Sequence, residues 1–449
     1  MGVDREIPKG WEITNLQGAV YVLDNLRKPI NSDEREKRIS GKKESELYPY
    51  YGATGQVGWI DEYITDGEYV LVGEDGAPFL DLSKPKAYII KGKTWVNNHA
   101  HILRFREGVT TNAFILHFLN QFNYDGYVNG TTRLKLTKSS LREIPFPLPP
   151  LSEQHRIVAK IDELFSSLDK GIESLTTAQQ QLKFYRQAVL KWAFEGKLTN
   201  KNVLDGELPE GWRYVKVEEI CNVVRGGSPR PAGDPKYYDG SIPFLKIADI
   251  TKDNSVFLTS YKYTIKEAGL HKTRRISPNT LLLSNSGATL GVPKICMIDA
   301  TMNDGIAAFL DLDPRSNLYL YYFWLSKTSE LRNINMGAAQ PNLNTDILKK
   351  YMVPYCSFET QKSIVSEIES RLSVCDKIEE SIEQSLKHAE SLRQSILKKA
   401  FEGKLVPQDP NDLPANALLE RIKTERERNK PEAPKIGRKG RIRTRRAQS

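Results

Sequence analysis

Residues 154–198 read QHRIVAKIDELFSSLDKGIESLTTAQQQLKFYRQAVLKWAFEGKL, and residues 361–405 read QKSIVSEIESRLSVCDKIEESIEQSLKHAESLRQSILKKAFEGKL. These two stretches align without a gap at an offset of 207 residues, and 19 of their 45 positions are identical. Similarity at one fixed offset is the signature of an internal repeat. The two halves also begin alike, because IPKGW at Ile7–Trp11 resembles LPEGW at Leu208–Trp212. The chain is therefore predicted to hold two similar modules in tandem.

Each repeated stretch predicts one long helix. Apolar residues recur at alternating spacings of four and three, which is the heptad pattern of pairing helices. Neither helical run contains proline, and Gly171 is the only glycine within them. Ser152 and Ser357 are candidate N-caps, while Gly196 and Gly403 are candidate C-terminal stops. About 40 residues at about 1.5 Å each predict rods about 60 Å long.

The two helices are expected to pair with each other, although each could instead lie separately on its own module. Polar residues in both seams weaken pairing between copies of one helix. A folded module separates the helices in the chain, so an antiparallel pair is the easiest arrangement to close. The residues expected to make this pairing are Ile161, Phe165, Leu168, Ile172, Leu175, Leu182, Val189, Ile368, Leu372, Ile382, Leu386 and Ile396.

The middle portions of the two halves, about residues 12–129 and 213–336, share little sequence. Short apolar runs bounded by turn residues predict strands there, at residues 69–72, 87–90 and 280–283. Asp75-Gly76 is interpreted as a hairpin turn after the first run, and Lys91-Gly92 as a turn after the second. Aromatic-rich helical segments are expected near residues 112–122 and 317–327.

The expected fold class is mixed α/β. Two globular modules are separated by two long helices that pair as an antiparallel coiled coil, and a pseudo-twofold relates the halves. The predicted bounds are 1–150 for the first module, 151–200 for the first helix, 201–356 for the second module, 357–406 for the second helix, and 407–449 for a C-terminal segment with a basic tail.

The net charge of +9 comes almost entirely from the C-terminus. Residues 423–449 hold 11 basic and 3 acidic side chains, which leaves the rest of the chain close to neutral. The overall charge therefore gives no argument that the folded part binds nucleic acid, and any such binding must use local surfaces. The basic tail, residues 435–446, is either a disordered, solvated terminus or a non-specific phosphate contact that salt removes.

Several classes of protein are disfavoured by what the sequence lacks. The longest apolar run, Leu318–Leu325, is far below the roughly 20 residues of a membrane span, and the first residues do not resemble a signal peptide. The four cysteines form no CxxC pair, which argues against disulfide scaffolds and zinc ribbons. We therefore expect a soluble protein of a reducing compartment, the cytoplasm.

Candidate catalytic and metal sites are weak. His99 and His101 could share one face of a strand, but no third ligand accompanies them, so structural roles are favoured. Residues 92–94 resemble the end of a P-loop but are not followed by a helix. Three carboxylates could suggest a nuclease, although a turn is the simpler interpretation: Glu74, Asp75 and Asp81. No catalytic residue and no metal site are predicted in this chain.

The repeated segments resemble the specificity subunit of type I restriction–modification systems. The resemblance is carried by Ile144–Asp169 and Arg186–Leu198 in the first half, by Val353–Glu369 and Leu392–Leu405 in the second, and by the motifs Pro209–Trp212 and Gln408–Asp412. The variable modules resemble the target-recognition domains of that family in segments 48–60, 69–77, 97–104, 242–250, 281–291 and 338–348.

The resemblance implies a mechanism without catalysis in this chain. Each target-recognition domain would read one half of a split sequence in double-stranded DNA, and the helices would set the unread gap. Two methyltransferase subunits would dock on the helices and bring S-adenosylmethionine for adenine-N6 methylation. Two motor–nuclease subunits, with ATP and Mg²⁺, would join for restriction.

Two other functions remain open. A coiled-coil scaffold that joins protein partners without reading DNA fits the near-neutral body. A self-contained nuclease would show Mg²⁺-dependent cleavage by the purified chain alone.

Polar residues on glycine-rich loops are the candidate DNA contacts, because loops can enter the grooves and reach base edges or phosphates. Many of the same residue types also form turns and caps, so only part of the set is expected to touch DNA. The first module contributes Tyr50, Tyr51, Thr54, Asn97, Asn98, His99, Thr131, Thr132 and Arg133. The second module contributes Arg225, Ser228, Arg230, Lys246, Asn285, Ser286, Thr289, Gln340, Asn342 and Asn344.

Overall fold

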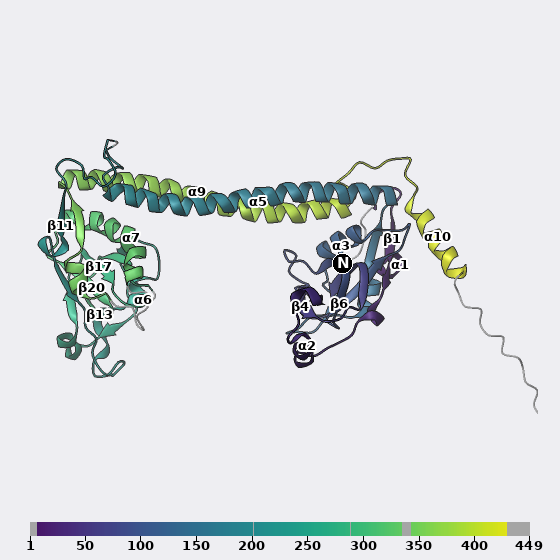
Figure 1. The fold of residues 1–449 in the computed structure, drawn as a ribbon, viewed down its shortest axis with the longest axis horizontal. Coiled ribbons are helices and arrows are strands. Elements are labelled where there is room, and N and C mark those ends of the chain that lie inside the picture. Colours follow the sequence, from purple (N-terminus) through teal and green to yellow (C-terminus); the bar gives the residue numbers. More distant parts are fainter. Residues whose placement is uncertain (1–6, 201, 288, 335–342, 429–449) are drawn as a thin grey trace, which may run out of the picture. The chain divides into compact units, whose positions relative to one another are not determined.

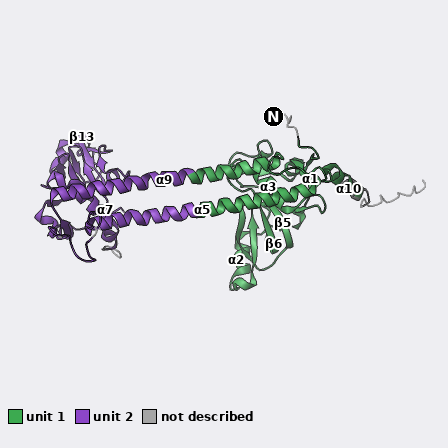
Figure 2. Cartoon of the chain, turned by 90° about the horizontal axis from the view of Figure 1, so that it is seen from above, with its two compact units in different colours: residues 1–173, 385–449 green, residues 174–384 purple. Residues whose placement is uncertain are grey.

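The computed structural model describes residues 7–200, 202–287, 289–334 and 343–428. The chain forms two compact units, shown in different colours in Figure 2: unit 1 is residues 1–173 with 385–449, and unit 2 is residues 174–384. Within the described residues, no helix is long and apolar enough to cross a membrane. The structure therefore divides at the two long helices, each of which contributes to both units.

Unit 1 is built around a six-stranded sheet of order β2-β7-β5-β6-β3-β4 (Figure 1). The strands are β2 (Val20–Val22), β3 (Tyr48–Gly52), β4 (Gly55–Ile60), β5 (Thr65–Gly73), β6 (Ala87–Val96) and β7 (Ala100–Phe105). Only the β3–β6 pair is parallel, and the other neighbours in this sheet run antiparallel. Two further antiparallel pairs join β1 (Glu12–Asn15) to β10 (Pro145–Leu148) and β8 (Val128–Asn129) to β9 (Lys135–Leu136).

Unit 1 also contains helices, most of which pack on its core. They are α1 (Leu16–Ala19), α2 (Ser32–Ile39), α3 (Asn112–Gln121), α4 (Lys138–Glu143) and α10 (Ala415–Arg428), with the first part of α5 (Leu151–Phe194) and the last part of α9 (Phe358–Phe401). One apolar cluster joins β5, α3 and the two long helices through Val70, Phe114, Ile157 and Ile396. Burial of this cluster is the main force that fixes the helices on the module.

Unit 2 holds two larger sheets, of order β12-β20-β17-β18-β14 and β15-β13-β19-β16, and the antiparallel pair β11–β21. The strands are β11 (Arg213–Lys216), β12 (Asn222–Arg225), β13 (Tyr238–Leu245), β14 (Phe257–Leu258), β15 (Thr264–Ile265), β16 (Arg274–Ile276), β17 (Thr280–Ser284), β18 (Pro293–Cys296), β19 (Ala300–Met302), β20 (Ile306–Leu310) and β21 (Met352–Tyr355). The helices are α6 (Ile247–Ile250), α7 (Asn317–Ile334) and α8 (Thr345–Lys349), with the last part of α5 and the first part of α9.

The long helices α5 and α9 contact each other in an antiparallel pair, as the sequence predicts. In unit 1, Arg393 of α9 donates a hydrogen bond to Asp169 of α5. In unit 2, Arg186 of α5 donates to Asp376 of α9 at 2.6 Å. Asp169 and Asp376 are equivalent residues of the repeat, and so are Arg186 and Arg393, because 207 residues separate the members of each pair. The same aspartate–arginine bond therefore forms twice, with the two helices exchanged. The duplication is thus present in the contacts as well as in the sequence.

Aromatic packing repeats in the same way. Phe401, the last residue of α9, lies 5.1 Å between ring centroids from Phe114 of α3. Phe194, the last residue of α5, lies 5.2 Å from Tyr319 of α7. Each long helix therefore ends on the aromatic face of the shorter helix that the sequence predicts in that unit.

The glycine stops of the long helices are confirmed. Gly196 and Gly403 adopt φ values of +75° and +67°, just after the helices end. This left-handed conformation is easily reached only by glycine, and it ends a helix by turning the chain away from the axis. A Cβ at Gly403 would lie 2.3 Å from Cγ of Pro8, and one at Gly196 would lie 2.2 Å from Cγ of Pro209. The same proline position of the repeat therefore packs against each stop.

One of the two predicted N-caps is correct and the other is wrong. Ser357 precedes α9, and its Oγ accepts a hydrogen bond from the backbone N–H of Thr360 at 3.2 Å. Ser152 lies inside the first turn of α5, because that helix already begins at Leu151. The carbonyl of Pro150 accepts the first helical bond, and the Ser152 hydroxyl instead donates to Asp412.

The predicted strands are present, but one predicted turn is not. Lys91-Gly92 lies within β6, which continues to Val96. Gly92 has a φ of +72° and stands opposite Gly67, which has a φ of +142°. Two facing glycines allow an irregular backbone inside a strand pair without breaking the ladder, so the local turn signal was misleading.

Asp75-Gly76 does not form a tight hairpin turn either. The β5–β6 pairing ends at Val72 and Ala87, so the connection between the strands is long. Gly76 donates its N–H to the carbonyl of Leu134 at 3.1 Å, so this segment is bonded to the loop that precedes β9. Asp75-Gly76 therefore connects segments that lie far apart in the sequence.

Candidate nucleic-acid interface

Four segments of unit 1 meet at a junction of loops, which we call the first polar edge: residues 50–54, 74–76, 97–99 and 131–136. At its centre, the N–H of Glu74 donates to the carbonyl of His99, and the carbonyl of Glu74 accepts from the N–H of Leu136, both at 2.7 Å. The N–H of Asn97 donates to the carbonyl of Tyr51 at 3.1 Å. Backbone bonds therefore place all four segments, whatever their side chains are.

Unit 2 contains the same junction, the second polar edge, formed by residues 225–230, 245–246, 285–287, 289–291, 303–305 and 343–344. The N–H of Asn285 donates to the carbonyl of Gly305 at 2.9 Å, and its carbonyl accepts from Leu343 at 2.7 Å. The N–H of Asn303 donates to the carbonyl of Leu245 at 3.0 Å. Each bond has its counterpart in unit 1. The variable portions thus share a backbone arrangement although their sequences share little.

The first polar edge carries an arginine held by a carboxylate. Oδ1 of Asp75 accepts from Nη2 of Arg133 at 2.6 Å and lies 2.8 Å from Nδ1 of His99. The side chain of Arg133 remains 61% exposed, whereas that of Asp75 is only 20% exposed. The structure therefore brings two of the predicted contact residues, His99 and Arg133, together around Asp75.

Ion pairs of Glu74 with Arg27 and Lys135 lie beside the first polar edge. Glu74 accepts a hydrogen bond from Arg27 and forms an ion pair with Lys135 at 3.2 Å. Burial alone would raise the pKa of the Glu74 carboxyl, but the bond from Arg27 and the nearby positive charges hold that pKa below its usual value. His101 is fully buried between Asp24, at 2.8 Å, and the carbonyl of Leu136. These two bonds hold the His101 ring inside the unit.

The described histidines at and beside the first polar edge pair with carboxylates. No group of three or more His, Cys, Asp or Glu side chains in the parts of the chain that the structure describes could hold a metal ion. His99 pairs with Asp75 and His101 with Asp24 instead.

The second polar edge gathers three predicted contact residues around Asp304. Its carboxylate accepts from the hydroxyl of Ser228 at 2.8 Å and from Nη2 of Arg230 at 3.4 Å. Its backbone carbonyl accepts from Nε of Arg225 at 2.5 Å. Arg230 is 71% exposed and Asp304 is 41% exposed, so the arginine head remains open to solvent.

Lysines and tyrosines extend this edge. The ammonium of Lys246 lies 3.7 Å from the ring centroid of Tyr263, a cation–π contact. The ammonium of Lys272 donates to the Tyr237 hydroxyl at 3.1 Å and to the carbonyl of Arg230 at 3.3 Å. The bond from Lys272 lowers the pKa of Tyr237. Cations beside aromatic rings suit contact with a nucleic-acid backbone and bases.

Some predicted contact residues hold the loops rather than face solvent. Tyr50 is 5% exposed, and burial raises the pKa of its hydroxyl. Asn97 is 7% exposed and accepts from the N–H of His99 at 2.8 Å. Asn344 caps α8 by accepting from the N–H of Asp346 at 3.1 Å, although this residue is exposed. Asn285 is fully buried, and its amide has no hydrogen-bond partner among the described residues.

The remaining predicted contact residues are open to solvent or lie outside the described residues. Seven are partly or fully exposed: Tyr51, Thr54, Asn98, Thr131, Thr132, Ser286 and Thr289. Gln340 and Asn342 lie outside the described residues. The twelve residues expected to pair the helices are all buried or partly buried.

Sequence reasoning missed Asp304, its neighbour Asn303, and Lys272. A usable signal was present, because WVNNHA at 95–100 and TMNDGI at 301–306 both begin with the last two residues of a strand and share an asparagine at the same place. Aligning these segments would have nominated residues 303–304 together with 97–98.

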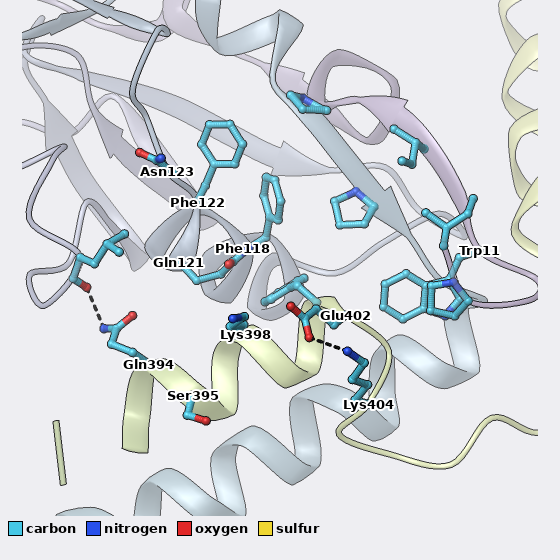
Figure 3. A pocket seen from close by; sticks show the side chains of 17 residues that line it. Trp11, Phe118, Gln121, Phe122, Asn123, Gln394, Ser395, Lys398, Glu402 and Lys404 are labelled. Atoms are coloured by element: carbon cyan, nitrogen blue, oxygen red, sulfur yellow. Dashed lines mark hydrogen bonds and ion pairs between the residues drawn. The ribbon is translucent and has the colours of Figure 1, made fainter. Parts of the chain in front are cut away.

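An apolar groove of about 910 Å³ lies elsewhere in unit 1, between α3, the β1–β10 pair and the end of α9 (Figure 3). Trp11, Phe118 and Phe122 line it, and Gln394 at its rim donates to the carbonyl of Leu82 at 2.7 Å. None of the predicted DNA contacts lines this groove. It is therefore separate from the candidate interface.

Comparison with known proteins connects both halves of the chain to one family. The family model described as the type I restriction modification DNA specificity domain matches residues 8–182 and 209–388. A putative type I restriction enzyme specificity subunit of Haemophilus influenzae is 29% identical over 407 residues, covering 85% of this chain and 94% of that protein. The EcoBI specificity subunit of Escherichia coli is 32% identical over 321 residues, covering 65% and 66%.

Solved structures share the fold. The crystal structure of the HsdS subunit from Thermoanaerobacter tengcongensis matches with a TM-score of 0.58 and 19% identity, covering 90% of this chain and 99% of that one. A chain from a study of complex assembly and conformational transition of the type I R-M system matches with a TM-score of 0.65 and 19% identity, covering 89% and 100%.

Proposed function

Because the chain belongs to the family of type I restriction–modification DNA specificity subunits, we propose that its two units read the two halves of a split DNA sequence. The specificity subunit is the non-catalytic part of such a system and confers its DNA target specificity. In this proposal, residues 1–150 and 201–356 are the target-recognition domains, residues 151–200 and 357–406 are the spacer helices, and residues 407–449 are the C-terminal segment.

The observation that carries the proposal is the repeated junction at the two polar edges. The same backbone bonds hold Glu74-Asp75 in one unit and Asn285-Ser286 in the other. A common frame with different polar side chains is what two readers of different base sequences require, because base edges are distinguished by hydrogen-bonding pattern. Tyrosine and lysine around each edge supply contacts to phosphate, and the exposed arginines reach base edges.

In the same proposal, α5 and α9 set the spacing between the half-sites and dock two methyltransferase subunits. Exposed apolar side chains on the helices support docking, since Phe184 is 70% exposed and Val374 is 55% exposed. The docked subunits bring S-adenosylmethionine and flip the target adenine out of the duplex. Two motor–nuclease subunits, with ATP and Mg²⁺, complete the restriction complex.

The test is modification-aware sequencing of host DNA, with the intact chain and with residues 213–336 replaced by the corresponding part of a relative. We expect adenine methylation on a split motif, and we expect the replacement to change only one half of it. A matched swap of residues 12–129 should change only the other half. Absence of any split motif, while an active partner methyltransferase is expressed, contradicts DNA reading and favours the scaffold function.

A further inference from the structure

We propose that Asp75 and Asp304 neutralise the exposed arginines of the two polar edges and thereby suppress binding to DNA of unrelated sequence. This inference rests on the proposed function and adds a specificity role for two carboxylates outside the predicted contact set. The arginines concerned are Arg133 and Arg230, which would exchange their carboxylate for a guanine edge at the correct site.

In unit 1, the arginine is held along the loop that carries its acid. Asp75 binds Nη2 of Arg133 at 2.6 Å, and His99 approaches the same oxygen at 2.8 Å. A Cβ at Gly76 would lie 3.2 Å from Nε of Arg133, so the bare backbone of Gly76 leaves room for the side chain to lie flat. The carboxylate is mostly covered while the guanidinium is open, so the cation remains reachable from solvent.

In unit 2, Asp304 has a similar relation to Arg230, with 3.4 Å between Oδ2 and Nη2. The hydroxyl of Ser228 holds the other carboxylate oxygen at 2.8 Å, which fixes the acid in place. Arg225 is fastened to the carbonyl of the same residue. The acid is therefore anchored, and the exposed arginine is the partner that can leave.

The two acids come from different parts of the junction. Asp75 follows β5, where unit 2 has Ser286, whereas Asp304 lies between β19 and β20, where unit 1 has Asn98. Each unit therefore places a carboxylate beside an exposed arginine, but from a different segment of the junction.

Electrostatics explains how a carboxylate beside an exposed arginine would reduce non-specific DNA binding. Non-specific binding to DNA comes almost entirely from cations that meet phosphates. A carboxylate beside an arginine cancels most of the net charge that attracts phosphates, whereas a guanine edge is uncharged and is recognised through two aligned acceptors. Exposed ion pairs are weak, so a correct base can displace the acid. Residues 1–150, with 19 basic and 19 acidic side chains, fit a unit that avoids general attraction to DNA.

The test measures the DNA affinity of the wild-type chain and of the variants Asp75→Asn and Asp304→Asn, each in the complex with the methyltransferase partner. One duplex has a random sequence, and the other carries the motif that the modification-aware sequencing identifies. Each variant should bind the random duplex about 3- to 10-fold more tightly at low salt, and the slope of log K against log salt should steepen by about one. The ratio of motif to random binding should fall. Adding Arg230→Gln to Asp304→Asn should abolish the gain.

The matched control is Asp299→Asn, which changes the net charge equally and leaves another exposed arginine, Arg275, without its partner at the far end of β19. Asp299→Asn should change neither the affinity for the random duplex nor the affinity for the motif duplex. An equal gain in this control, or unchanged random binding in both test variants with normal melting temperatures, overturns the inference. A wild-type complex that binds motif and random duplex equally contradicts the proposed function itself.

Discussion

Arg133 and Arg230 occupy the most informative positions at the residue scale. Both belong to loops fixed by backbone hydrogen bonds, and both keep their guanidinium groups open to solvent. Arginine is the side chain best suited to guanine, because its planar fork can donate two parallel bonds. Tyr50 and Asn97, predicted from the same sequence features, are instead buried and hold the loops.

Replacing either arginine by alanine should weaken binding to the motif by about 1–3 kcal/mol if the arginine is bidentate to guanine. Arg133→Ala should relax preference in one half-site and Arg230→Ala in the other, as measured by equilibrium titration with single-base variants of the motif. Arg275→Ala, which removes a similarly exposed ion-paired arginine, should leave affinity unchanged. Unchanged affinity and base preference would remove the tested arginine from the interface.

Acid should destabilise unit 1 through Glu74. Its folded-state pKa is lowered below the ordinary value of 4.5, so the ionised carboxyl stabilises the fold above that pH. The contribution is lost as the pH falls through the lower, folded-state value. Glu74→Gln should therefore be less stable at neutral pH and lose less stability on acidification. Denaturant unfolding between pH 7 and pH 3 measures this, and equal pH dependence in both proteins would contradict it.

At the scale of elements, the two long helices are defined by their ends as much as by their seams. Gly196 and Gly403 each take a left-handed φ and each leave room for a proline of the repeat. The glycines therefore end the helices and allow the start of a module to pack against the stop.

Gly403→Ala should destabilise unit 1 by about 1–2 kcal/mol or more, since alanine meets both an unfavourable φ and the ring of Pro8. Gly171→Ala is the matched control, because Gly171 lies inside α5 with nothing within 4 Å of a Cβ. That change should stabilise by about 0.5–1 kcal/mol. Denaturant midpoints measure the stability of both variants. Equal changes in stability would contradict the expected strain of alanine at position 403.

At the scale of the whole molecule, charge is distributed unevenly along the chain. The body is close to neutral and the end is strongly basic, so general attraction to DNA depends on the tail if it contacts phosphate at all. The basic stretch at 435–446 lies outside the described residues.

Deleting residues 429–449 should flatten the salt dependence of DNA binding if the tail binds phosphates, by about 0.9 in the log–log slope for each phosphate that the tail neutralises. Binding to the motif and to random duplex should weaken together, because phosphate contacts carry no sequence information. A tail in which the basic residues are replaced by glutamine provides the control for length. An unchanged slope would leave the solvated terminus as the remaining alternative.

The sequence by itself determined the duplication, the two long helices, their glycine stops and the mixed α/β character of the modules. These features depend on periodicity and on residues close together in the chain, which a linear pattern records directly. Only the tertiary structure decided that Glu74 meets His99 and Leu136, that Asp304 meets Arg230, and that Lys91-Gly92 continues a strand. Such contacts join residues far apart in the chain, and their geometry depends on how whole sheets pack, which local preference does not specify.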